Sequence, residues 1–427
     1  MESAKGPIRA DHLNRYARLL VELGAGLRPG QQLFVGGGVI HRDLASRVTD
    51  AARDLGADRV HLDLVDPLQE AQLIAGGDPR LIAWYHQRNR RWLDEVVASG
   101  GAVISLAGVE FPDFVRELAA AHPKSYALHR SGKLGLFAAF QELVVQKRRC
   151  PWVAAPGFSP VWARQVFPDT DPIDAIAHLA EIVLHCAFAD REDGLAAAME
   201  HDRRLRVRQD ALDALEIAEL HVTGGGNDLR VALSPRARWL GSALETVSGQ
   251  RFHANVPSEE SYTTPDARHT RGRLAASRPF RPGGGELVRD LVLELRDGRV
   301  VELDASQGRD AFAEWLAVDE GARRLGEIAL VGEDSPLART GLFFDLPLLD
   351  ENAACHAALG DAYRAALAGG LDMDRGELDE IGCNRSAVHS DLVFGSPQVS
   401  VVATESREGE VVLIADGHWT GRFAIVR

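Results

Sequence analysis

The chain has 427 residues, of which 45% are hydrophobic, and a formal net charge of −14. This length exceeds the size at which a single hydrophobic core usually stops growing, so we expect two domains. The acidic balance argues against nucleic acid as a partner, because phosphate binding needs a basic surface. No stretch approaches the roughly 20 apolar residues that span a bilayer, which argues against a membrane protein.

The first residues and the cysteines indicate a cytoplasmic protein. Residues 1–7 lack the apolar core of a signal peptide. Cys150, Cys186, Cys355 and Cys383 fall at no zinc-finger or CxxC spacing and are too few for a disulfide scaffold. We therefore expect reduced thiols.

The first half alternates between strand and helix patterns. A helical stripe over Leu13–Leu23 precedes an apolar strand at Gln32–Val35, and an amphipathic helix follows at Leu44–Arg53. Two further strands are predicted at Arg59–Leu64 and Ala102–Leu106. Strands separated by helices of this length favour parallel βαβ units, so the pattern predicts an α/β domain with a largely parallel sheet.

The pattern changes to short strands and tight turns after a charged helical region that ends near Glu219. We place the boundary between residues 1–215 and 216–427 and predict that the second domain is α+β. Two hairpins are expected around Asp297-Gly298 and Glu408-Gly409. Between them the sequence predicts helices over Asp310–Leu325 and roughly over Glu351–Leu367.

The second half also carries five metal-type side chains on short motifs: Glu260, Glu327, His356, His389 and Asp391. Three carboxylates and two imidazoles suit a pair of divalent cations if one carboxylate bridges them. Glu327 directly precedes an apolar strand, where a carboxylate is rare unless it is paired or ligates something. His389 and Asp391 alternate on a predicted strand, so both side chains point to the same side.

His356 falls on the second predicted helix. Tyr363 lies seven residues later, which would put both side chains on one helix face, two turns apart. A lone histidine on a helix is more often a partly buried residue whose ring nitrogens are hydrogen-bonded than a metal ligand. The five residues taken together are a stronger signal than any one of them.

These motifs resemble the aminopeptidase T / aminopeptidase S family of dinuclear metallopeptidases. The matching stretches are Asn255-Val-Pro-Ser-Glu-Glu260, Asp319-Glu-Gly-Ala-Arg-Arg-Leu-Gly-Glu327, Asp350-Glu-Asn-Ala-Ala-Cys-His356 and Val388-His-Ser-Asp391. Weaker matches at Gly224–Leu229, Leu27–Gly30 and Trp162–Pro168 extend the resemblance over essentially the whole chain. Two departures are Ser261-Tyr262 after the acidic doublet and Cys355 before the histidine.

The resemblance implies an α/β and α+β metalloaminopeptidase that acts on peptides with a free N-terminus. It puts the family's metal ligands at Glu260, Glu327, His356, His389 and Asp391, with two divalent ions as cofactors. Zn, Co, Mn and Mg all remain possible, since no thiolate appears among the ligands. It also implies a homodimer whose two halves enclose the active-site cavity.

Two further residues are candidates for catalysis. By analogy with other dinuclear aminopeptidases, Glu259 is a candidate general base. Adjacent residues on an extended strand face opposite ways, so Glu259 fits this role only if the backbone bends there. Tyr363 matches a tyrosine that the family keeps near its metals and could donate a hydrogen bond to the tetrahedral oxyanion, although a buried tyrosine with a satisfied hydroxyl is the alternative.

Two other functions stay open from the sequence. His356, His389 and Asp391 could form the two-histidine, one-carboxylate triad of a mononuclear iron oxygenase that cleaves an aromatic ring. Glu260 and Glu327 disfavour this function, because one iron would not need them. A non-catalytic scaffold protein would be expected to have lost a ligand, and all five are present.

Overall fold

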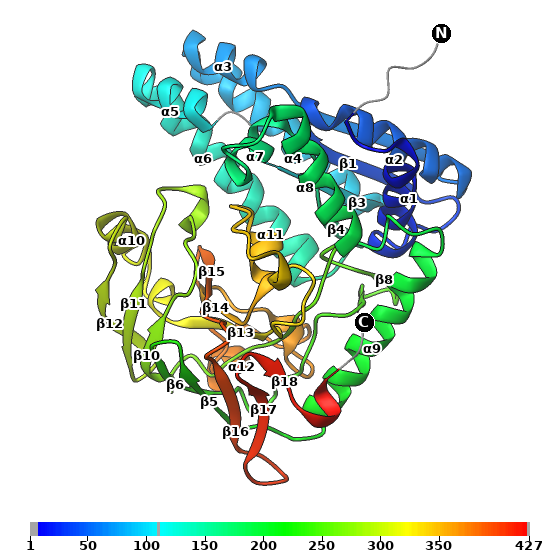
Figure 1. Cartoon of the computed structure of the whole chain (residues 1–427). Coiled ribbons are helices and arrows are strands. Elements are labelled where there is room, and N and C mark those ends of the chain that lie inside the picture. The colour runs from blue at the N-terminus through cyan, green and yellow to red at the C-terminus, as the bar shows by residue number, and fades with distance from the viewer. Residues whose placement is uncertain (1–6, 109–111, 425–427) are drawn as a thin grey trace. The chain divides into compact units, whose positions relative to one another are not determined.

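The computed structural model describes residues 7–108 and 112–424 (Figure 1). The expectation drawn from residues 1–6 therefore lies outside the described part of the chain. The chain forms two compact units, residues 1–199 with 243–257 and residues 200–242 with 258–427. The sequence put a single boundary after residue 215. In the structure the division instead falls within one continuous helix, α9 (Gly194–Asp213).

The first unit is built on a four-stranded sheet with the order β2-β1-β3-β4. Its strands are β1 (Gln32–Gly38), β2 (Arg59–Val65), β3 (Ala102–Ala107) and β4 (Trp152–Pro156), and every pairing is parallel. The predicted α/β domain with a parallel sheet is confirmed. A small antiparallel pair, β7 (Leu244–Glu245) with β8 (Arg251–Phe252), also belongs to this unit.

Helices connect and cover these strands. They are α1 (Ala10–Leu19), α2 (Arg42–Asp54), α3 (Pro67–Gly76), α4 (Pro79–Ser99), α5 (Pro112–Ala121), α6 (Pro123–Phe140), α7 (Pro160–Val166) and α8 (Pro172–Cys186). Phe34 and Val103 of the sheet pack against Leu93 and Val96 of α4. Three of the helices begin in the same way, since Asp66, Asp78 and Asp171 each cap a helix whose first residue is proline.

The second unit contains an eight-stranded sheet with the order β12-β11-β10-β6-β5-β16-β17-β18. Its strands are β5 (Glu219–Gly224), β6 (Asn227–Ala232), β10 (Arg271–Ala275), β11 (Val292–Arg296), β12 (Arg299–Asp304), β16 (Ser400–Glu405), β17 (Val411–Ala415) and β18 (His418–Trp419). Both predicted hairpins are present, as β11 with β12 and β16 with β17. The predicted α+β class of this half is also confirmed.

A second, four-stranded sheet has the order β15-β14-β13-β9 and is antiparallel throughout. Its strands are β9 (Ser261–Thr263), β13 (Leu325–Leu330), β14 (His356–Gly360) and β15 (His389–Val393). Leu229 and Leu293 of the larger sheet share one hydrophobic core with Ile328 and Leu392 of this smaller sheet. The core therefore supports the smaller sheet, on which the candidate ligands lie.

Two helix predictions in this unit need correction. The first helix, α10, spans only Arg309–Trp315, and the chain has entered β13 by Leu325. The helix predicted over Glu351–Leu367 is wrong, because this segment follows α11 (Pro347–Asp350), begins with a 3-10 turn (Glu351–Ala353) and continues as strand β14. Alanine favours helices in isolation, but β14 is an interior strand buried along its whole length, where small side chains fit between the neighbouring strands.

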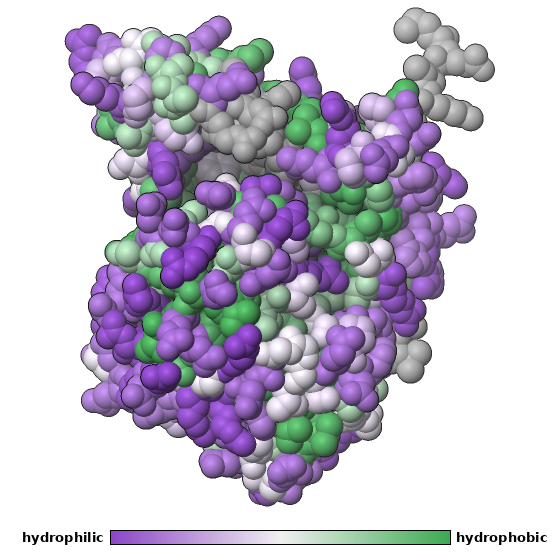
Figure 2. Space-filling view, turned by 60° about the vertical axis from the view of Figure 1, so that its left-hand side comes forward, coloured by the Kyte–Doolittle hydropathy of each residue, from purple (hydrophilic) through white to green (hydrophobic). Residues whose placement is uncertain are grey.

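One face of the molecule is mainly hydrophilic (Figure 2). Figure 2 shows that hydrophilic residues cover most of the visible face and interrupt the hydrophobic patches. Within the described ranges, no helix combines the length and the apolar character needed to cross a membrane.

Candidate metal centre

The register of the smaller sheet brings the candidate ligands onto one face. Glu327 of β13 lies opposite Ala358 of β14, which in turn lies opposite Asp391 of β15. Residues that face each other across antiparallel strands project to the same side, as do residues two apart on one strand. His356 lies two residues before Ala358, and His389 lies two residues before Asp391. Both histidines therefore lie on the same face as Glu327 and Asp391. The sequence expectation for His389 and Asp391 on one strand holds, whereas His356 reaches the face from a strand rather than from a helix.

Glu260 joins this face from the edge of the sheet. It immediately precedes β9, whose Tyr262 lies opposite Ala329 of β13. Ala329 also lies opposite His356, so Tyr262 belongs to the same face. A residue two positions before Tyr262 on extended backbone points the same way, which directs Glu260 toward His356.

The five side chains form two groups of three that share Glu327. Glu260, Glu327 and His356 form one triad, and Glu327, His389 and Asp391 form the other, with the ligand atoms of each group within 4.8 Å of one another. The two oxygens of Glu327 face different histidines, with Oε1 3.9 Å from Nε2 of His356 and Oε2 3.4 Å from Nε2 of His389. This is the arrangement expected of a carboxylate that bridges two cations.

The two triads differ in their exposure to solvent. The side chains of Glu260 and His356 are 7% and 1% exposed, and those of His389 and Asp391 are 22% and 17% exposed. The second triad is therefore less buried than the first. A substrate would reach the second triad more easily.

Backbone carbonyl groups orient both imidazole rings. Nδ1 of His389 lies 2.8 Å from the carbonyl oxygen of Asp361, and Nδ1 of His356 lies 3.3 Å from that of Ala354. A carbonyl oxygen can only accept, so Nδ1 carries the proton in each ring. Nε2 would then offer its lone pair to a bound cation, which is the usual orientation of a histidine ligand.

The ionisation of the second triad reflects its crowding. Burial raises the pKa of Asp391, but the adjacent His389 outweighs this effect and the net pKa lies below its usual value. Burial lowers the pKa of His389, and the two carboxylates Asp391 and Glu327 more than reverse this, so that the pKa lies well above its usual value. The raised pKa of His389 reflects the negative charge of the carboxylates around it, and the lowered pKa of Asp391 reflects its pairing with that histidine.

Tyr363 borders the ligand cluster. It follows β14 and precedes a short 3-10 turn, and its ring centroid lies 5.1 Å from that of His389. Burial, together with the carboxylates of Glu327 and Asp391, raises the pKa of its hydroxyl well above the usual value. The hydroxyl is therefore held in its protonated, donating form. The helical face that the sequence analysis proposed for His356 and Tyr363 does not exist, although both residues border the same cluster.

Glu259 occupies different surroundings from Glu260. Its carboxylate Oε2 lies 3.4 Å from Nε2 of His201, and it belongs to neither triad. Its charge also raises the pKa of the buried Arg208, although burial has the larger effect and lowers that pKa to about 10. This placement follows from the alternation of neighbouring residues on extended backbone.

Glu351 is a carboxylate that the sequence analysis did not single out. Burial and the charges of three ligand carboxylates raise its pKa well above the usual value. It belongs to neither triad, although the charges of their carboxylates act on it. In the sequence it lies within the stretch Asp350-Glu-Asn-Ala-Ala-Cys-His356 that carries the family resemblance, without an apolar strand directly after it.

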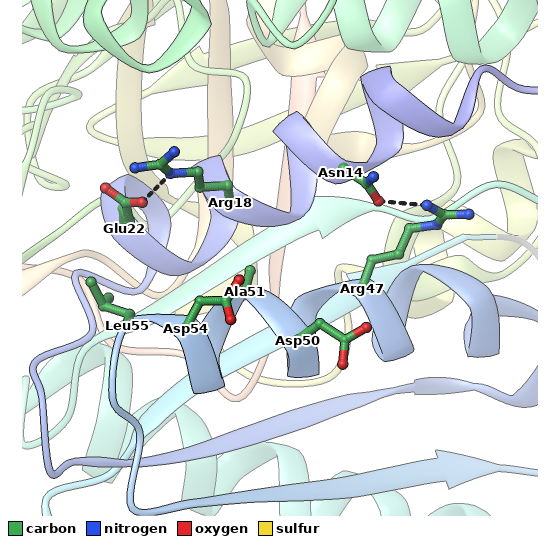
Figure 3. A pocket seen from close by; sticks show the side chains of 8 residues that line it. All are labelled: Asn14, Arg18, Glu22, Arg47, Asp50, Ala51, Asp54 and Leu55. Atoms are coloured by element: carbon green, nitrogen blue, oxygen red, sulfur yellow. Dashed lines mark hydrogen bonds and ion pairs between the residues drawn. The ribbon is translucent and has the colours of Figure 1, made fainter.

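A surface pocket of about 500 Å³ lies elsewhere, between α1 and α2 of the first unit (Figure 3). Among its lining residues, Arg18 forms an ion pair with Glu22, and Arg47 donates a hydrogen bond to the amide oxygen of Asn14 (Figure 3). None of the predicted site residues lines it. The candidate metal centre is thus separate from this pocket.

Comparisons with known proteins agree with the geometry. A family model described as thermophilic metalloprotease (M29) matches residues 9–419. Aminopeptidase T of Thermus aquaticus is 32% identical over 421 residues, which cover 96% of this chain and 98% of that protein. Aminopeptidase 2 of Geobacillus stearothermophilus is 30% identical over 412 residues, with 96% and 98% covered. The structure of wild-type AmpT from Thermus thermophilus matches with a TM-score of 0.79 at 29% identity, over 96% of this chain and 99% of that one.

Proposed function

The chain belongs to the thermophilic metalloprotease (M29) family and is a peptidase, and from this premise we propose that it is a dinuclear metal-dependent aminopeptidase. The observation that carries the proposal is the pair of triads joined by Glu327. The similar proteins Aminopeptidase 2 and Aminopeptidase T are aminopeptidases by name. This supports the proposal that the chain removes residues from the N-terminus of peptides.

The donor set fits two divalent cations. Three carboxylates and two imidazoles are hard or borderline donors, of the kind that zinc, cobalt, manganese and magnesium accept. Three negative charges gathered in a largely buried cluster are costly unless positive charge offsets them. Glu260 and His356 would hold one ion, His389 and Asp391 the other, and Glu327 both.

The reaction would divide among the chain's own residues. When bound, two cations supply the Lewis acidity that polarises a peptide carbonyl and lowers the pKa of a water. Tyr363 would donate a hydrogen bond to the oxygen that becomes negative in the transition state. A carboxylate beside the ligands would take the proton of the attacking water and pass it to the leaving amine.

The alternative of a mononuclear iron oxygenase gains no support. Its three ligands, His356, His389 and Asp391, fall in two different triads among the described residues. The named relatives are aminopeptidases rather than oxygenases. We therefore do not carry this alternative further.

The proposal is tested by metal content and hydrolysis together. Chelated protein should regain close to two ions per chain when Co²⁺ or Zn²⁺ is added, and should then release leucine from a leucyl peptide. The same peptide with an acetylated N-terminus should resist cleavage, because an aminopeptidase needs the free amine. No metal uptake, or cleavage of both peptides at equal rates, would contradict the proposal.

Replacing Tyr363 by phenylalanine should lower kcat by about tenfold to a hundredfold, since the lost hydrogen bond acts on charge that develops in the transition state. KM should change by less than kcat, and metal content should stay that of the wild type. Steady-state kinetics on a leucyl peptide measures both constants. A rise in KM at constant kcat would assign Tyr363 to substrate binding instead.

A cytoplasmic location and a homodimer also remain proposals. The location is supported by cysteine spacing that suits neither a disulfide scaffold nor a metal site, and the four thiols are buried. The dimer is supported by the family resemblance alone. Sedimentation of the purified chain would measure its oligomeric state.

A further inference from the structure

We propose that Asn352 is a positioning residue that fixes Glu260 in the more buried triad. The inference rests on the proposed function, since it assigns Glu260 to a bound cation. The amide side chain of Asn352 acts through the backbone of Glu259, next to the ligand Glu260.

Asn352 is fully buried, and its side chain makes two hydrogen bonds. Its Oδ1 accepts the backbone N–H of Glu259 at 2.7 Å, and its Nδ2 donates to the carbonyl oxygen of Leu348 at 3.0 Å. Its own carbonyl oxygen accepts the hydroxyl of Ser335 at 2.9 Å. Asn352 is therefore fixed through both its side chain and its backbone, and it gives the N–H of Glu259 a rigid hydrogen-bond acceptor.

Glu260 depends on this contact because it lies just beyond the end of the sheet. The pairing of β9 with β13 begins at Ser261, opposite Leu330. The pairing of β9 with β13 therefore restrains Glu260 from its C-terminal side. The hydrogen bond from Asn352 to the preceding residue restrains it from the other side.

The contact also joins two segments that both serve the site. Asn352 lies between Glu351, on which the charges of the ligand carboxylates act, and His356, which completes the more buried triad. Its bond to Glu259 therefore fixes the spacing between Glu260 and His356, whose Oε2 and Nε2 atoms lie 3.4 Å apart. Small errors in such spacing weaken a metal site, because ligand geometry sets its affinity.

The expected consequence is confined to one of the two triads. In Asn352→Ala, the cation held by Glu260 and His356 should bind about 10- to 100-fold more weakly, the usual cost of losing an outer partner of a metal ligand. The cation held by His389 and Asp391 should bind as in the wild type. At limiting metal the content should fall from two ions per chain toward one.

The experiment is a Co²⁺ titration of the chelated full chain, read by metal analysis and by visible absorption. Asn227→Ala is the matched control. Asn227 is also a buried asparagine, which accepts the N–H of Ala275 at 2.8 Å and donates to the carbonyl of Gly224 at 3.0 Å, but it lies in the larger sheet. It should lose stability in the same way yet keep two ions and full activity.

Two further variants separate the hydrogen bonds of Asn352. Asn352→Asp keeps the acceptor for Glu259 but cannot donate to Leu348, so it should bind the cation held by Glu260 and His356 more tightly than the alanine variant does. Asn352→Leu preserves volume and serves if the alanine variant does not fold, with the same loss expected. Wild-type affinity for both ions in a folded alanine or leucine variant would overturn the inference, and so would an aspartate variant no better than alanine. If the wild-type chain itself binds no metal, the proposed function fails instead.

Discussion

Replacing Glu327 by glutamine is expected to lower hydrolysis by on the order of 10³-fold or more and to weaken both metal positions at once. Replacing a residue that supports a metal ligand lowers metal affinity or activity roughly 10- to 100-fold. Glu327 is itself a member of both triads, so a larger loss is expected. The amide of glutamine has one oxygen and no charge, so it cannot bridge two cations as a carboxylate does. Metal content per chain and the rate of leucine release measure the two effects.

The metal-free form of this variant should melt close to the metal-free wild type. Glu327 is 4% exposed and glutamine has nearly the same volume, so packing is preserved. The comparison needs chelated samples, because bound ions stabilise the wild type by mass action. Glu302→Gln, at an exposed position on β12, is the control and should retain activity. Full activity in Glu327→Gln would remove this residue from the site.

The sequence predicted the first unit better than the second because the relevant signals are local there. The strand at Gln32–Val35 is indicated by an apolar run followed by glycines, and the helix after it by the helical spacing of its apolar residues. The β14 strand has no such signal. Its alanine-rich sequence is helical by propensity, and only its position between β13 and β15 makes it a strand.

The candidate ligands were predicted from the sequence even though strand β14 was not. Glu327, His389 and Asp391 stand out locally, because charged groups beside apolar strands need partners. The sharing of Glu327 between two triads follows from the register of three strands, which no local pattern contains. The same holds for Glu351, whose relation to the ligands depends on a turn between α11 and β14.

The two remaining carboxylates, Glu259 and Glu351, are rival candidates for the general base. The acidic doublet in the sequence favours Glu259. We propose Glu351 as the alternative, because it interacts with the charges of the ligand carboxylates, whereas the carboxylate of Glu259 contacts His201. Both assignments can be compared with one pair of variants, each of which replaces a carboxylate by an amide of the same shape.

Glu351→Gln is expected to lower kcat by about 10²- to 10⁴-fold, the usual contribution of a positioned base, while two ions per chain remain bound. The metal should remain because Glu351 belongs to neither triad. Glu259→Gln should lower kcat by less than about tenfold, since the base would be intact. Single-turnover hydrolysis of a leucyl peptide by the metal-loaded variants separates chemistry from product release.

The reverse order of the two losses would return the role to Glu259 and would require its carboxylate to leave His201. A loss of metal in Glu351→Gln would instead make Glu351 a further ligand, because a base acts on the water without holding the ions.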